Sequence, residues 1–494
     1  EPVVVGPHSV CEDDAEQFSG FLPAGGGARY FFWLARSRSP APDADPLAIW
    51  LTGGPGCSST LALLSENGPC HVAAGGGGQP RATRRNAWSW TEAANVVWVD
   101  QPAGAGFSEG PAVDSERGVV EHMYAFLQSF YGRFPEFLGV PLFLLGESYA
   151  GHYLPAIAAR ILKEPTVGGS PILLRGVGIG NGLVNPWPQL SSQPTMAYTG
   201  GVGGSLGHGV VGLPAFEAME AALPACHRLL LQCQREQQDG SRSICFAAFR
   251  ACVMPQVLAI MQTGRNLYDM RSSCSAGYPL CYSFAEEAAF LRDPEVQRTL
   301  GVQPARGWDT CNMSISLAFI ASGDWLQRFD QRVAELLGAG LRVLVYNGDT
   351  DYIVDWIGSK RWAMELAWPG RAAWAAAPDQ PFLVDGRARG LERIRAGFTF
   401  LQVYSAGHLV PRDQPEAALA MVRELLAPSS RWAAAAGAAT EGRPESWHSS
   451  AALPAAALLA ILLALSLAPP LRRACAASSA ASAAAYGRRP LLAA

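Results

Sequence analysis

The stretch 141–155 (PLFLLGESYAGHYLP) restricts the fold more than any other part of the chain. It begins with the apolar run 142–145, which is too short for a helix and suits a buried strand. A tight turn around Ser148 follows, and 153–163 then has the apolar spacing of a helix. The pattern is G-x-S-x-A, with Ala150 where the general motif has glycine. Strand, serine-centred turn and helix together predict a nucleophile elbow.

A serine hydroxyl needs a general base and an orienting carboxylate before it becomes a good nucleophile. On folds built around a nucleophile elbow, these groups follow the serine in the order acid, then histidine. Asp349 and Asp351 follow the strand-like run 342–346, and His408 follows the last such run. All lie where carboxyl ends of strands are expected, which is where ligands bind in open α/β sheets. The residues alone leave both aspartates open as the acid.

A glycine-rich loop, 53–59 (GGPGCSS), follows the strand-like run 46–52. It lacks the Lys-Ser/Thr ending of a phosphate-binding loop. We therefore predict that its backbone amides face a developing oxyanion near Ser148.

The order of elements predicts an α/β-hydrolase fold, with a central mixed, mostly parallel sheet and a mainly helical, disulfide-stapled cap. Strand alternation fades between 184 and 310, where cysteines, glycines and short amphipathic segments dominate. The expected organisation is a core in two parts, a cap and a C-terminal region: 1–183, 184–310 (the cap insertion), 311–428, the linker 429–450, the apolar stretch 451–471 and the tail 472–494.

The composition excludes several classes of protein. The chain has 494 residues, is 49% hydrophobic and carries a net charge of −4, so nucleic acid is not an expected partner. None of the 11 cysteines forms a C-x-x-C pair, and we expect neither a metal nor another cofactor. The chain begins at Glu1 without a signal segment, which we interpret as a mature or truncated form.

The cysteines favour an oxidising, secretory compartment. Cys226, Cys233, Cys245 and Cys252 are symmetrically spaced, which suits two nested disulfides, although four cysteines allow three connectivities. Asn312 begins a glycosylation sequon, which agrees with that compartment.

The stretch 451–471 is uncharged, apolar and followed by two arginines, so it is long enough to span a membrane as a type I anchor. It is also rich in alanine and contains prolines, which suits a low-complexity tail. Both interpretations stay open.

Eight motifs together resemble the serine carboxypeptidase family, the group that contains carboxypeptidase Y and cathepsin A. They are WLTGGPGCSS (50–59), ENGP (66–69), NAWSW (86–90), DQPAGAGFS (100–108), GESYAGHYLP (146–155), GIGNGLVNP (178–186), GDTDYIV (348–354) and SAGHLVP (405–411).

The resemblance implies a role for each matching residue. Ser148 would be the nucleophile, His408 the base and Asp351 the orienting acid. The amides of Gly54 and Tyr149 would form the oxyanion hole. The other implied groups are a carboxylate-binding site (Trp50, Thr52, Gly53, Glu66 and Glu147) and a substrate pocket (Tyr149, Trp325 and Ile353). We expect five disulfides: Cys57–Cys311, as the resemblance implies, with Cys226–Cys252, Cys233–Cys245, Cys274–Cys281 and Cys11–Cys70.

The implied carboxylate site has a physical logic. Glu66 and Glu147 cannot both ionise cheaply if they lie together, so one keeps its proton at a raised pKa and can donate to a substrate carboxylate. This predicts a serine carboxypeptidase that releases C-terminal residues through an acyl-enzyme, best at acidic pH. Many family members have asparagine where this chain has Thr52. Acyltransferases on the same fold share that threonine, so acyl transfer or ester hydrolysis is the alternative, and a non-catalytic binding protein is the alternative from another class.

The resemblance and the cysteine usage also predict a location. We expect the secretory pathway, with a vacuole-like or lysosome-like compartment or the extracellular space as the destination.

Overall fold

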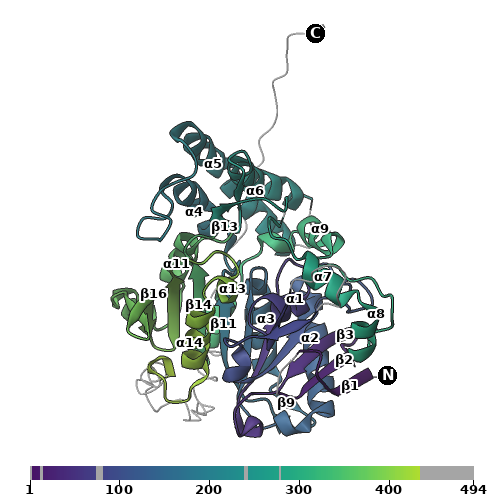
Figure 1. Cartoon of the computed structure of the whole chain (residues 1–494). Coiled ribbons are helices and arrows are strands. Elements are labelled where there is room, and N and C mark those ends of the chain that lie inside the picture. The colour runs from purple at the N-terminus through teal and green to yellow at the C-terminus, as the bar shows by residue number, and fades with distance from the viewer. Residues whose placement is uncertain (1–2, 12–14, 74–81, 239–242, 278–279, 434–494) are drawn as a thin grey trace, which may run out of the picture. The chain divides into compact units, whose positions relative to one another are not determined.

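The computed structural model describes residues 3–11, 15–73, 82–238, 243–277 and 280–433 (Figure 1). An eleven-stranded sheet forms its centre, in the order β1-β2-β3-β7-β4-β8-β11-β14-β17-β16-β15. The strands of this sheet are β1 (Val3–His8), β2 (Gln17–Pro23), β3 (Arg29–Ala35), β4 (Leu47–Leu51), β7 (Asn95–Val99), β8 (Leu142–Glu147), β11 (Leu174–Gly180), β14 (Arg342–Gly348), β15 (Gln380–Val384), β16 (Arg387–Arg395) and β17 (Phe398–Val403).

The sheet is mixed and mostly parallel. Strands β7, β4, β8, β11, β14 and β17 are consecutive neighbours and pair in parallel. The outer strands β1 to β3 and β15 to β16 pair antiparallel. The carboxyl ends of β8, β14 and β17 therefore meet at one edge, and the predicted fold class is confirmed.

The inner strands are buried on both faces. Neighbouring residues such as Ile49 and Trp50 are both fully buried and belong to separate hydrophobic clusters. The helices that cover the sheet are α1 (Ser59–Ser65), α2 (Glu116–Arg133), α3 (Ala150–Lys163), α10 (Asp330–Gly338), α11 (Trp356–Glu365) and α14 (Pro415–Leu426). Helices α2, α3, α10 and α11 cover one face and α1 and α14 cover the other. Such double burial explains why these strands read as continuous apolar runs.

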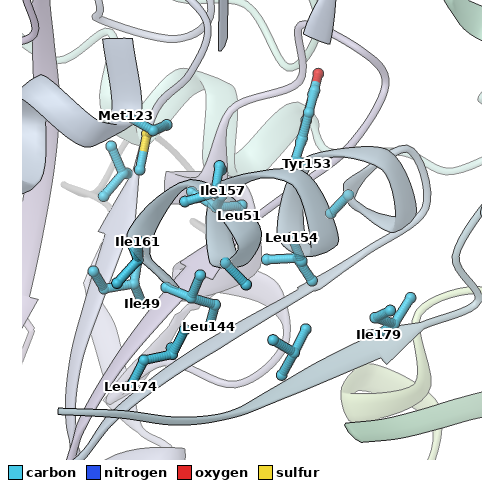
Figure 2. Close-up of a cluster of buried hydrophobic side chains, with 14 of the residues drawn as sticks. Ile49, Leu51, Met123, Leu144, Tyr153, Leu154, Ile157, Ile161, Leu174 and Ile179 are labelled. Atoms are coloured by element: carbon cyan, nitrogen blue, oxygen red, sulfur yellow. The ribbon is translucent and has the colours of Figure 1, made fainter. Parts of the chain in front are cut away.

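Helix α3 sits directly behind Ser148. Its Leu154, Ile157 and Ile161 are buried against strand residues that include Ile49 and Leu144 (Figure 2). This apolar contact fixes the start of the helix, and with it the turn that carries the serine.

The cap lies over the carboxyl edge of the sheet in Figure 1. It contains α4 (Pro186–Thr199), α5 (Leu213–Gln238), α6 (Cys245–Met261) and the ribbon β12 (Arg265–Asn266) with β13 (Asp269–Ser273). Disulfides Cys226–Cys252 and Cys233–Cys245 join α5 to α6 and are nested as expected. Cys274–Cys281 and Cys11–Cys70 also form.

The remaining elements are short. They are β5 (Cys70–Val72) with β6 (Thr83–Arg85), β9 (Thr166–Val167) with β10 (Ser170–Pro171), α7 (Ala285–Leu291), α8 (Pro294–Thr299), α9 (Met313–Ser322), α12 (Arg371–Ala376), α13 (Val410–Asp413) and the 3₁₀ turns Pro42–Ala44, Trp90–Glu92, Pro135–Phe137 and Asp324–Leu326, the last called η4. Although α7 lies within the expected cap insertion 184–310, its Phe290 and Leu291 join the cluster beneath α1 and α14.

Most of the C-terminal region, including 451–471 and 472–494, lies outside the described residues. Within the residues that are described, no helix is both long and apolar enough to cross a bilayer.

Replacing Ile157 by alanine tests the support behind the serine. Ile157 is fully buried, so the cavity should lower the free energy of unfolding by about 2–5 kcal/mol. Leu317→Ala, at a site that is 60% exposed, should change it by less than about 0.5 kcal/mol. Urea denaturation followed by circular dichroism measures both. Equal effects of the two substitutions would contradict the packing described here.

Candidate active site

Ser148 stands in a strained turn between β8 and α3. Its φ is 64°, a left-handed conformation that non-glycine residues rarely adopt. Its amide donates to the carbonyl of Gly180, and its own carbonyl accepts from Gly151 and Leu183. Strain of this kind persists only where surrounding structure holds it. These three backbone bonds hold the turn and present the serine side chain at the sheet edge.

His408 and Asp351 form a buried pair at the same edge. Nδ1 of His408 lies 2.7 Å from Oδ2 of Asp351. The same Oδ2 accepts from Nδ2 of Asn181 at 2.8 Å, and the backbone amides of Ile353 and Val354 also donate to the carboxylate. With these donors around it, Asp351 can orient an imidazole and stabilise an imidazolium.

Asp349 faces a different partner set. Its carboxylate accepts from the amide and hydroxyl of Ser205, at 2.6 Å each, and from the amide of Ser405. It therefore joins a cap loop to the loop that carries His408, and only Asp351 of the two aspartates contacts the imidazole.

A cavity of about 280 Å³ lies over the serine and the histidine. Ser148, His408, Gly54 and Tyr149 all border it. Within the described part of the chain, Nε2 of His408 has no hydrogen-bond partner, so no other protein group occupies it. The arrangement has the elements of acyl transfer: a nucleophile, a base with its orienting acid, and backbone amides near the reacting centre.

The glycine-rich loop packs tightly against the serine turn. A Cβ on Gly53 would lie 2.3 Å from the nitrogen of Tyr149 and 2.8 Å from Cβ of Ser148. Gly54 has a φ of 110°, which side-chain-bearing residues rarely adopt. Only glycine therefore lets this backbone come so close to the turn.

The loop is also fastened to the segment that leads into α9. Cys57 and Cys311 form the expected disulfide. Ser58 donates its amide to the carbonyl of Thr310, and Asn312 donates its amide to the carbonyl of Gly56. These bonds fix the position of the backbone amides beside the nucleophile.

Glu66 and Glu147 are buried side by side. Each is at most 2% exposed. Burial, and to a lesser extent the neighbouring Glu66, raises the pKa of Glu147 well above its ordinary value. Burial raises the pKa of Glu66 as well. Two such carboxyl groups share protons, so the pair can donate as well as accept hydrogen bonds.

The expected carboxylate-site residues are not equally close to the cavity. Thr52 and Glu147 border it directly, and Glu66 reaches it through its contact with Glu147. The indole Nε1 of Trp50 donates to Oγ1 of Thr52 at 2.9 Å. Trp50 is fully buried and acts on the site by orienting this hydroxyl.

The rest of the cavity wall is mostly apolar and comes from both the cap and the body. Trp325 and Ile353 border the cavity as expected. Trp325 is half-buried and packs edge-on against Phe249 of α6, with ring centroids 5.1 Å apart. Among the described residues, no group of three or more His, Cys, Asp or Glu side chains could hold a metal.

Three residues of the site were not anticipated from the sequence. Asn181 contacts Asp351, the carbonyl of Tyr268 accepts from the amide of His408 at 2.7 Å, and Asp324 accepts from the hydroxyl of Tyr149. Asn181 lies inside the motif at 178–186, so the sequence could have indicated that it belongs to the site. Asp324 and Tyr268 lie in no such motif.

Comparison with known proteins agrees with this geometry. A sequence model of the serine carboxypeptidase family matches residues 7–428. Carboxypeptidase Y homolog A of Fusarium vanettenii is 36% identical, with 84% of this chain and 74% of the relative covered. Serine carboxypeptidase-like 47 of Arabidopsis thaliana is 35% identical, with coverages of 81% and 76%. The chain belongs to the serine carboxypeptidase family.

A solved structure shows the same fold. The prohormone-processing carboxypeptidase Kex1Δp of Saccharomyces cerevisiae superposes with a TM-score of 0.71 at 23% identity, over 83% of this chain and 91% of that one. With the family established by sequence, the protein is a serine-type carboxypeptidase, a hydrolase that acts on peptides.

Gly53→Ala tests the close approach of the glycine loop. The added Cβ would collide with backbone atoms of the serine turn, which cannot move aside as a flexible side chain could. We expect kcat/KM for a peptide substrate to fall at least about a hundredfold, the loss typical of a disrupted oxyanion site. Gly132→Ala in α2, where nothing lies within 4 Å of the new atom, is the control and should keep full activity. An active Gly53→Ala enzyme would contradict this packing.

Proposed function

We propose that the enzyme removes C-terminal residues through an acyl-enzyme on Ser148. Oγ of Ser148 attacks the last peptide carbonyl while Nε2 of His408 takes its proton. The amides of Gly54 and Tyr149 stabilise the oxyanion, and His408 then protonates the leaving amine. Water, activated by the same histidine, releases the shortened peptide. The His408–Asp351 pair at 2.7 Å, beside a cavity shared with Ser148, is the observation that supports this assignment most directly.

The Glu66–Glu147 pair is proposed to recognise the free carboxylate of the substrate. A carboxylate cannot approach two ionised acids, but it can accept a hydrogen bond from a protonated one. The burial of both groups and the raised pKa of each support a shared proton. Thr52, whose hydroxyl borders the cavity, adds one hydroxyl to this site.

The apolar wall formed by Tyr149, Trp325 and Ile353 is proposed to accept a bulky apolar side chain before the scissile bond.

Five disulfides support a secretory compartment, and Asn312 is the proposed glycosylation site. The names of the relatives, carboxypeptidase Y and prohormone-processing carboxypeptidase, agree with peptide or protein C-termini as substrates.

Ser148→Ala should abolish both labelling by a fluorophosphonate probe and release of amino acids from N-blocked dipeptides. The wild-type enzyme should cleave free acids well and the matching C-terminal amides poorly. Labelling without any release would instead favour acyl transfer to an alcohol or ester hydrolysis, which ester formation with an added alcohol would reveal. Labelling that survives Ser148→Ala would contradict the assigned nucleophile.

The acid pair also predicts the pH dependence. The protonated form binds substrate, so kcat/KM for free-acid dipeptides should be high near pH 5 and fall as the pH rises through the raised pKa of the pair. The pKa of Glu66 is raised to about 8, so the fall should lie between about pH 7 and about pH 9. Glu147→Gln keeps a donor that does not titrate, so its fall over that range should be several times smaller. A wild-type profile that keeps rising above neutrality, or a variant profile with the same shape, would contradict the proposal.

A further inference from the structure

We propose that Asp324 is a positioning residue that holds Tyr149 in place and so sets both oxyanion stabilisation and the choice of residue before the scissile bond. The hydroxyl of Tyr149 donates to Oδ1 of Asp324 at 2.7 Å, and the two residues are at most 7% exposed. This inference rests on the proposed function, because there the amide of Tyr149 faces the oxyanion and its ring contacts the substrate. The hydrogen bond therefore acts on a residue with two roles in the reaction.

Asp324 is itself anchored to the body of the enzyme. Its Oδ2 accepts from the backbone amide of Glu116 at 2.8 Å, at the first residue of α2. Its own amide donates to the hydroxyl of Ser322. Asp324 therefore links the first residue of α2 to the ring of Tyr149, next to Ser148.

The same residue also fixes a second wall of the cavity. Asp324 and Trp325 are consecutive in η4, and Trp325 borders the cavity together with Tyr149. Trp325 packs on Phe249 of the cap helix α6. One carboxylate thus sets the spacing between a wall from the body and a wall held by the cap.

Asp324 borders open space on one side. A second cavity, of about 600 Å³, is bordered by Asp324, Glu116 and Phe329. His152 is fully buried beside Tyr149, and burial lowers its pKa, so it is neutral. Its Nδ1 is 3.7 Å from Oδ1 of Asp324, too far for a hydrogen bond. The ring of Tyr149 packs against Tyr153 and Phe319, so the hydrogen bond from its hydroxyl adds to packing and fixes the end of the ring that faces Asp324.

Tyr149→Phe tests the link because it removes only the hydroxyl and keeps the backbone amide and the ring. Tyr153→Phe is the matched control. It removes the same atom one turn along α3, from a ring that packs 5.4 Å from Tyr149 and does not border the substrate cavity. In Figure 2 the hydroxyl of Tyr153 points away from the buried side chains beneath α3.

We expect Tyr149→Phe to lower kcat/KM about tenfold for a dipeptide with a bulky apolar residue before the scissile bond. The preference for that residue over alanine should also fall several-fold. The preference for free acid over C-terminal amide should stay unchanged, because Glu66, Glu147 and Thr52 are untouched. Tyr153→Phe should stay within about twofold of wild type in all three measurements.

Substitutions of Asp324 complete the test. Asp324→Ala removes the bond to Tyr149 and also the bond to the amide of Glu116, so it should change the preference at least as much as Tyr149→Phe. Adding Tyr149→Phe to Asp324→Ala should cause little further loss, because the bond that it removes is already gone. Asp324→Asn keeps one acceptor oxygen in place of two, so it can accept from the hydroxyl of Tyr149 only with an NH2 group facing the amide of Glu116, and it should recover only part of the activity. Additive losses, or a Tyr149→Phe enzyme indistinguishable from Tyr153→Phe, would overturn the proposal.

A measurement that needs no peptide substrate separates this proposal from the proposed function. Circular dichroism checks that each variant is folded. The rate of fluorophosphonate labelling of Ser148 also depends on the oxyanion amides and needs no peptide substrate. If wild type released no amino acid, the peptidase proposal would fail. The labelling rates would still decide the role of Asp324. We expect wild type and Tyr153→Phe to be labelled faster than Tyr149→Phe and Asp324→Ala.

Discussion

The site depends on one strained peptide turn that would not persist alone. Ser148 has a φ of 64° because the chain must reverse sharply between β8 and α3, and neighbours on three sides hold it there. The turn is held by the parallel strands next to β8, by the apolar face of α3 and by the backbone of Gly53, which has no side chain. This close approach requires small residues at the turn, and it requires a sheet that is covered by helices on both faces.

Segments that are far apart in the sequence meet around the site through contacts of different kinds. The disulfide Cys57–Cys311 and the backbone bonds beside it hold the glycine loop. Asp349 joins Ser205 of the cap to the histidine loop, and Asp324 joins Tyr149 to α2. The substrate cavity is thus enclosed by parts far apart in the sequence that are nevertheless tied to one turn.

This separation explains what the sequence could predict. Ser148, Asp351 and His408 lie in short contiguous motifs at strand ends, so their meeting at one sheet edge follows from topology. Asp324 acts on a residue 175 positions away, and no local pattern marks it. The hairpin of β15 and β16 was also missed, because a charged segment such as RARGLERIR lacks the apolar alternation that signals a buried strand.

A buried pair of acids and a single buried acid lie near Ser148, and the partners of each decide what it can do. Glu66 and Glu147 face each other, so burial and mutual repulsion favour a retained proton, which suits a site for an anion. Asp324 instead faces the hydroxyl of Tyr149 and the amide of Glu116, two donors that suit an acceptor. Burying a carboxyl group is costly in either case. Apolar residues in place of these acids could pack equally well. They could neither donate a hydrogen bond to a substrate carboxylate nor accept one from the hydroxyl of Tyr149.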